Sequence, residues 1–296
     1  MTGWRDGLEG EHALDVAHLD RALGLELRER TYVEALVDPR GHLFQRLEYV
    51  GDAILDSVVL QSLVRIEPWS EPDLSLISGE QQALVSDHAL GKVAARRGLP
   101  DVRAFTASLH RLADRIEASI GAAWADSGIA AAETVAARLV VAPGLRHVEL
   151  RGELPRAEGD YRYETAARVC GHDPLEPAWY GAAAAGGPAR RRLAAVGNAV
   201  LEAAFSTAQY VEAPWATEAE MSEERRSATS NAVLAERAHD LGLVDGHDPA
   251  DRRSVADEVQ ALVGAATMDG GTVAGLEVAA GVLGRSFAPG PVDLLP

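Results

Sequence analysis

The chain has 296 residues, of which 47% are hydrophobic, 25% charged and 5% aromatic, a composition typical of folded helical proteins and sufficient for about two domains. A single cysteine, Cys170, excludes an intrachain disulfide and a multi-cysteine zinc site. The formal net charge of -17 argues against a basic nucleic-acid-binding surface over the whole chain.

The N-terminal residues carry acids and lack an apolar core of signal-peptide length, and no window reaches about 18 uninterrupted apolar residues. These features predict a soluble, cytoplasmic protein that does not bind a membrane. A reducing compartment also suits the single cysteine, which is expected to be a small buried residue and not a nucleophile.

The first strong element is a helix predicted at residues 44–65, where Leu47, Val50, Ile54 and Val58 recur at spacings of three and four. Further helices are predicted at residues 80–97, ending before Gly98, and at residues 224–240. Between them, the Ala/Gly tract at residues 181–188 is predicted to be a flexible loop. It lacks the strand before it and the Lys-Ser or Lys-Thr after it that a phosphate-binding loop requires.

Three blocks of the first half recur in the second half. Residues 46–55 and 192–201 share the pattern Arg-Leu-x-x-Val-Gly-x-Ala-x-Leu, residues 86–90 resemble 230–234, and residues 112–122 resemble 255–265. The copies keep their order and lie about 145 residues apart. This spacing predicts a duplication with one domain at residues 1–150, a second at residues 151–296, and a linker near residues 142–160 that is rich in Pro and Gly.

Two pairs of acids in the first half have helical spacing. Glu48 and Asp52 are four residues apart within an apolar run, and Asp114 and Glu117 are three apart, so each pair projects from one helix face. Carboxylates on a semi-buried face require a cation or strong donors. Oxygen donors without nearby His or Cys favour Mg²⁺ or Mn²⁺ over zinc.

Residues 46–55 resemble the hallmark motif of the ribonuclease III family, and residues 112–122 resemble its second acidic motif. The resemblance is strong over residues 20–140 and weak over residues 160–285. It implies an all-α fold of two ribonuclease III-like helical domains that form an intramolecular pseudo-dimer. It also implies metal-dependent cleavage of double-stranded RNA, with 5′-phosphate and 3′-hydroxyl ends, by the metal ligands and catalytic residues Glu48, Asp52, Asp114 and Glu117, of which Glu117 would be the most sensitive.

The second copy departs from that pattern. Ala194, Asn198 and Gln260 replace the acids Glu48, Asp52 and Glu117 of the first copy, and only Asp257 is kept. One carboxylate cannot assemble the metal site, so the second domain is expected to be catalytically silent and each pseudo-dimer to cut one strand. In the first copy, Gln45 and Gln81 stand where the family often has Glu and a basic residue.

No double-stranded-RNA-binding domain is expected after the second copy, so RNA contacts must come from the two domains or from a partner. Clustered arginines of the second half are candidate phosphate contacts, namely Arg190, Arg191, Arg192, Arg225, Arg226, Arg252 and Arg253. The alternative for these arginines is solvated helix ends and salt bridges.

Two other functions remain open from the sequence. The fold could serve as a non-catalytic RNA-binding or assembly module, or the metal site could act on another phosphate ester. Oligomeric state is open as well: the pseudo-dimer predicts a monomer, whereas a homodimer of first domains would bring together two complete acidic sites.

Overall fold

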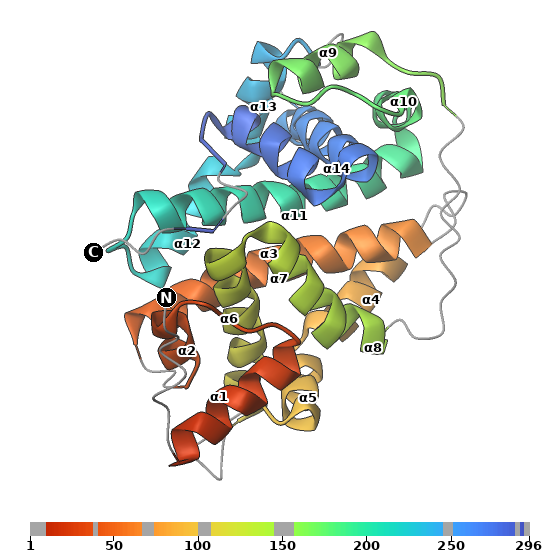
Figure 1. The fold of residues 1–296 in the computed structure, drawn as a ribbon. Helices are drawn as coiled ribbons and strands as arrows, with labels where there is room; N and C mark the ends of the chain where they lie inside the picture. Colours follow the sequence, from red (N-terminus) through yellow and green to blue (C-terminus); the bar gives the residue numbers. More distant parts are fainter. Residues whose placement is uncertain are drawn as a thin grey trace. The chain divides into compact units, whose positions relative to one another are not determined.

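The structure is a computed structural model that describes residues 10–37, 41–66, 74–99, 108–144, 157–244, 251–287 and 291–292. All regular secondary structure in these ranges is helical (Figure 1). The prediction of an all-α fold is confirmed.

The helices fall into two groups along the chain. Those of the first half are α1 (Gly10–Leu23), α2 (Arg30–Val37), α3 (His42–Ile66), α4 (Leu74–Val85), α5 (Asp87–Arg97), α6 (Leu109–Ser127), α7 (Ile129–Ala136), the π-helical segment η2 (Ala137–Val141) and α8 (Ala142–Gly144). Those of the second half are α9 (Tyr161–Val169), α10 (Pro177–Ala184), α11 (Gly187–Glu212), α12 (Glu218–Ala228), α13 (Asn231–Asp240) and α14 (Arg252–Leu283).

The chain divides by packing into two compact units. Unit 1 comprises Met1–Leu55, Gln82–Arg146 and Pro289–Pro296, and unit 2 comprises Asp56–Gln81 and His147–Ala288. The long helix α3 therefore contributes its first part to unit 1 and its last part to unit 2. The sequence predicts a boundary at residue 150, whereas the packing units assign residues 56–81, 147–150 and 289–296 differently. The boundary therefore stays a prediction about the duplication.

Unit 1 is organised around the crossing of α3 and α6. Leu47 and Ile54 of α3 are fully buried, as the helical periodicity predicts. At the crossing, a Cβ atom on Gly51 would collide with the carbonyl oxygen of Glu117, and one on Gly121 would collide with the carbonyl oxygen of Leu47. The two main chains are therefore in contact, which only glycine permits at these positions.

Unit 2 contains the same kind of crossing between α11 and α14. A Cβ atom on Gly197 would meet the carbonyl oxygen of Gln260, and one on Gly264 would meet that of Leu193. These four residues occupy the positions of the repeat that correspond to the crossing residues of unit 1. Both units thus use paired glycines to bring two long helices into main-chain contact.

A buried aspartate after each crossing anchors a loop. Asp126 accepts hydrogen bonds from two successive backbone N–H groups just before α2, at 2.7 and 2.8 Å. Asp269 accepts two just before α10, at 2.9 and 2.6 Å. Two residues later, Gly128 (φ 85°) separates α6 from α7 and Gly271 (φ 80°) interrupts α14. The two units therefore share local structure beyond the recurring sequence blocks, the last of which end at residues 122 and 265.

Two predicted helices are each divided in the structure. The helix predicted at residues 80–97 is α4 followed by α5, and the one predicted at 224–240 consists of the end of α12 followed by α13. Ser86 and Ser230 separate them, because each has an extended backbone and its hydroxyl accepts a hydrogen bond from the first turn of the next helix. The predictions of single helices were wrong because N-capping serines within them were overlooked.

The Ala/Gly tract at residues 181–188 is mostly helical, so the prediction of a flexible loop was wrong. Helix α10 extends to Ala184, and α11 begins at Gly187. Gly181 is buried where a Cβ atom would collide with the carbonyl oxygen of Glu158. The glycine there serves close packing, and the turn is confined to the junction of the two helices, where Gly186 has φ 75°.

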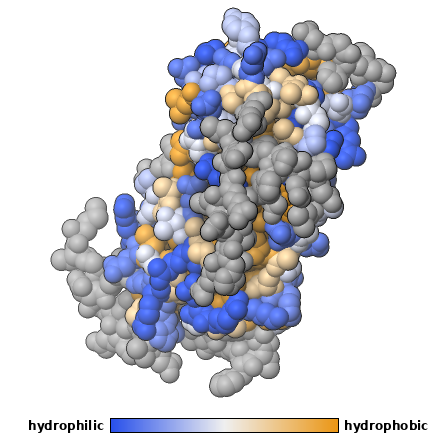
Figure 2. Space-filling model, turned by 90° about the vertical axis from the view of Figure 1, so that its right-hand side faces the viewer, coloured by the Kyte–Doolittle hydropathy of each residue, from blue (hydrophilic) through white to orange (hydrophobic). Residues whose placement is uncertain are grey.

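The visible described surface is largely hydrophilic, with smaller apolar areas between the polar ones (Figure 2). Few large apolar side chains are exposed among the described residues: Leu109, Tyr161, Val169, Leu175, Trp215 and Val273. Within the part of the chain that the structure describes, no helix is both long enough and apolar enough to span a bilayer.

Candidate metal centre

The first acid pair lies on α3, next to the glycine of the crossing. Glu48 and Asp52 are four residues apart and both are half-buried. They occupy one side of a helix whose neighbouring positions, including Leu47 and Ile54, form the core. The apolar run therefore fixes the direction in which both carboxylates point.

The second pair lies on α6, which the crossing holds against α3. Asp114 and Glu117 are also half-buried. Carboxylate oxygens of Glu48, Asp114 and Glu117 all lie within 4.8 Å of one another. Three of the four predicted ligands are thus brought together, and the fourth, Asp52, lies one helical turn from Glu48.

The electrostatics of the cluster are dominated by Glu117. Burial, and after it the negative charges of Asp52, Glu48 and Asp114 in that order of importance, raise its pKa to about 9. Asp52 therefore interacts with the cluster even though it is outside the 4.8 Å group. Without a cation, four carboxylates in this space cannot all ionise.

This donor set fits a divalent cation. The donor atoms of Glu48, Asp114 and Glu117 are carboxylate oxygens, which Mg²⁺ and Mn²⁺ prefer as ligands. A bound cation would also offset the repulsion that raises the pKa of Glu117. The residues predicted from the sequence are therefore suited to hold the metal.

Two residues beside the cluster were not among the predicted site residues. Nδ1 of His110 lies 2.9 Å from Oδ2 of Asp87 and 3.6 Å from Oδ1 of Asp114. The charge of Asp114 and the hydrogen bond with Asp87 raise the pKa of His110. The Ser-Asp sequence that begins α5 and the position of His110 one turn before Asp114 were the available signals.

The corresponding place in unit 2 holds a hydrogen-bonded amide pair. Nε2 of Gln260 donates to Oδ1 of Asn198 at 3.0 Å, and Nδ2 of Asn198 donates to Glu202 at 3.0 Å. Ala194 is buried beside them. Asp257 keeps its carboxyl group, whose pKa is raised by burial. Two neutral amides thus bond to each other where unit 1 has two carboxylates, and one of these amides also donates to the carboxylate of Glu202.

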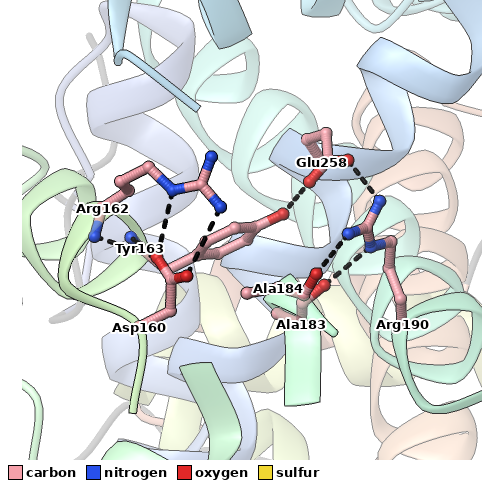
Figure 3. A network of polar contacts seen from close by, with 7 residues as sticks. All are labelled: Asp160, Arg162, Tyr163, Ala183, Ala184, Arg190 and Glu258. Atoms are coloured by element: carbon pink, nitrogen blue, oxygen red, sulfur yellow. Dashed lines mark hydrogen bonds and ion pairs between the residues drawn. The ribbon is translucent and has the colours of Figure 1, made fainter. Parts of the chain in front are cut away.

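Arg190, a predicted RNA contact, is part of an internal network in unit 2 (Figure 3). It forms an ion pair with the buried Glu258, and it donates to the backbone carbonyls of Ala183, at 2.7 Å, and Ala184. The hydroxyl of Tyr163 donates to the other oxygen of Glu258. The network ties α9 and the junction of α10 and α11 to α14, so a structural role accounts for Arg190.

The other predicted arginines differ in exposure. Arg192 is buried, with 1% of its surface exposed, which does not fit a contact with RNA. Arg225 donates to Ser206 at 3.3 Å, and Arg226 pairs with the neighbouring Glu223. The exposed members of the set that have no ion pair with described residues are Arg191, Arg252 and Arg253.

Comparison with known proteins finds similarity within the first half. The family described as Ribonuclease III domain matches residues 45–128. Ribonuclease 3 of Delftia acidovorans is 34% identical over 101 residues, which cover 31% of this chain and 43% of that protein. Ribonuclease 3 of Albidiferax ferrireducens is 33% identical over 125 residues, which cover 38% of this chain and 54% of that protein. The matches thus span about half or less of these relatives.

A solved structure extends the likeness in fold to most of the chain. The crystal structure of Dicer from Giardia intestinalis matches with a TM-score of 0.57 at 15% identity, and the match covers 83% of this chain and 55% of that one. At this identity the likeness concerns the fold alone. The acids that the fold brings together lie within the matched family domain.

Proposed function

We propose, from its membership of the ribonuclease III family through residues 45–128, that this chain is a divalent-metal-dependent endoribonuclease acting on double-stranded or structured RNA. The observation that carries the proposal is the convergence of Glu48, Asp114 and Glu117 within 4.8 Å. It occurs inside the matched domain, on the residues that the resemblance assigns to the metal.

The chain's own residues have defined tasks in this proposal. Glu48, Asp52, Asp114 and Glu117 would bind the cation, and the glycine crossing of α3 and α6 would fix their separation. When bound, the cation supplies Lewis-acid chemistry that polarises the phosphodiester and favours attack by water. Glu117, with its raised pKa, would release a proton as the cation binds.

The second half is proposed to be silent in catalysis. The hydrogen bond between Gln260 and Asn198 supports this, because the two side chains satisfy each other where cation ligands would be required. With one complete acid set per chain, a monomeric pseudo-dimer would cut one strand of a duplex. Mass in solution and the ratio of cuts on the two strands test this, and equal cleavage of both strands by a monomer would contradict it.

The main test uses a matched pair of variants. Asp114→Asn removes a carboxylate from the proposed site, and Asp257→Asn makes the same change at the corresponding position of unit 2. With a labelled RNA duplex and Mg²⁺, the first variant should lose cleavage and the second should keep it. Equal rates of RNA cleavage for the two variants would contradict the assignment of the catalytic site to unit 1.

The assay also separates the other functions. RNA binding that needs no divalent ion, without cleavage, would identify a non-catalytic RNA-binding module. Cleavage of a simple phosphodiester such as bis-p-nitrophenyl phosphate, with RNA untouched, would identify a different phosphate-ester substrate.

A further inference from the structure

Unit 1 contains a cavity lined by basic side chains and separate from the carboxylate cluster. Its volume is about 420 Å³, and its basic lining residues are His18, Arg21, Arg96, Arg97 and Arg138. They come from α1 and α5, both labelled in Figure 1, and from η2, three elements that are separate in sequence. Among the described residues that line the cavity, none is acidic. In a chain with a net charge of -17, this gathering of four arginines is unusual.

Two of the arginines are held in position by the main chain. Nε and Nη2 of Arg138 donate to the carbonyl oxygens of Ala22 and Arg21, at 3.3 and 3.1 Å. Nη2 of Arg97 donates to the carbonyl oxygen of Arg138 at 2.9 Å. A guanidinium has five N–H groups, so most donors of both side chains are left for a ligand. The fixed orientation lowers the entropic cost of binding.

The other two arginines are exposed. The side chains of Arg21 and Arg96 form no ion pair or hydrogen bond with the part of the chain that the structure describes. Arg21, Arg96 and Arg97 lie in the last turns of α1 and α5, where a cation favours the carbonyl end of a helix. That interaction explains single cations at single helix ends. It does not account for several arginines around one cavity whose described lining residues include no acid.

We propose that this cavity binds a phosphate group of the RNA backbone at a distance from the cleaved bond, an inference that rests on the proposed function. Guanidinium groups match the geometry of phosphate oxygens and can bind them in pairs. A second hollow of about 290 Å³, lined by Val93, Arg96, Arg97 and Pro143, adjoins these arginines. Arg96 and Arg97 therefore face two hollows, as a surface that follows a strand through more than one phosphate requires.

RNA binding by the full-length chain tests the proposal without chemistry. The double variant Arg21→Ala/Arg96→Ala is compared with Arg30→Ala/Arg237→Ala, which removes the same charge from exposed ion pairs outside the cavity. Both are made in a Glu117→Gln chain, and fluorescence anisotropy follows a labelled RNA duplex across salt concentrations. The cavity variant should bind about tenfold more weakly, with a salt slope smaller by about two, and the control should change less than about twofold.

Equal affinity and salt slope for the two double variants would overturn the proposal. Circular dichroism checks folding, and if the double variant is unfolded, the single variants Arg21→Gln and Arg96→Gln should each lower the slope by about one. Calorimetric titration with inorganic phosphate tests whether the cavity binds free phosphate instead of a phosphate group of RNA. If phosphate binding depends on the cavity while RNA binding does not, the cavity serves a free anion and the assignment to RNA is wrong.

The cleavage assay keeps this inference separate from the proposed function. If the wild type cleaves RNA and the cavity variant binds RNA like its control, the enzyme assignment stands and the cavity assignment fails. If RNA binding depends on the cavity but the wild type does not cleave RNA with Mg²⁺, the opposite holds.

Discussion

The crossing of α3 with α6 and that of α11 with α14 share a backbone arrangement and differ in charge. Both bring main chains together through glycines, Gly51 with Gly121 and Gly197 with Gly264. In unit 1 the side chains beside the crossing are carboxylates, and their mutual repulsion helps raise the pKa of Glu117 to about 9. In unit 2 two of the four corresponding side chains, Asn198 and Gln260, are amides that are hydrogen-bonded to each other.

The comparison distinguishes two groups of residues within the repeated motif: one builds the helix crossing, and the other carries its charge. The glycines and the apolar positions build the crossing, and they are present in both units. The carboxylates of unit 1 destabilise the crossing, because charged groups repel one another in a partly buried space. Unit 2 therefore keeps the scaffold of the crossing without three of the four carboxylates.

The largest expected effect is on catalysis. Glu117→Gln should lower the rate of RNA cleavage with Mg²⁺ on the order of a thousandfold, because a proposed metal ligand is lost. Gln260→Ala, at the corresponding position of unit 2, should leave the rate within about twofold of the wild type. Single-turnover cleavage of an RNA duplex measures both, and a similar loss in the two variants would show that the crossings share the catalytic task.

The next effect is on stability and should be equal in the two units. Gly51→Ala and Gly197→Ala each place a methyl group against a carbonyl oxygen of the facing helix. Each should lower the free energy of unfolding by about 3 kcal/mol, as overpacking at a rigid contact does. Urea denaturation measures this, and a clear difference would mean that one crossing relaxes more easily than the other.

A smaller effect follows from recharging unit 2. The double variant Asn198→Asp/Gln260→Glu replaces the amide hydrogen bond by two facing carboxylates. Without divalent ions it should lose about 2 kcal/mol of stability. Part of this should return when Mg²⁺ is added, which thermal denaturation with EDTA and with Mg²⁺ would show. Unchanged stability in EDTA would refute the role given to charge.

The smallest effect concerns the position that follows Asp114 in unit 1 and Asp257 in unit 2. Unit 1 has buried Arg115 there, whereas unit 2 has buried Glu258, whose pKa is raised by burial from 4.5 to about 7. A raised pKa contributes stability that is complete below about pH 4.5 and is lost as the pH rises through about 7. Relative to Glu258→Gln, the wild type should therefore lose on the order of 1 kcal/mol over this range. Denaturation at several pH values measures the difference, and parallel pH profiles would contradict it.

Helix α3 and the acid set could be predicted because local signals are strong. The apolar period of residues 47–58 specifies a buried helix, and acids at spacings of four and three specify shared faces. The convergence of the two pairs depends on a contact between α3 and α6 that is distant in sequence. Only the family resemblance, and not the spacing itself, pointed to that contact.

The remaining features depend on tertiary partners that a sequence does not name. Arg190 and Arg192 look like a basic cluster, yet one pairs with Glu258 and the other is buried. The cavity arginines are spread over three elements, so no run of basic residues marks them. Ser86 could have been recognised, since a serine between two helical periods is a common N-cap.

The glycine crossings have a consequence for how such a protein can change over time. Because the main chains touch, the backbone sets the spacing of the facing side chains whichever residue types occupy these positions. Exchanging one oxygen for nitrogen in an Asp and in a Glu keeps the shape of each side chain and gives the amide pair seen in unit 2. Two of the three changes that separate unit 2 from the acid set of unit 1 thus remove a charge and keep the shape of the side chain, so the helix crossing can outlast the charges that it carries.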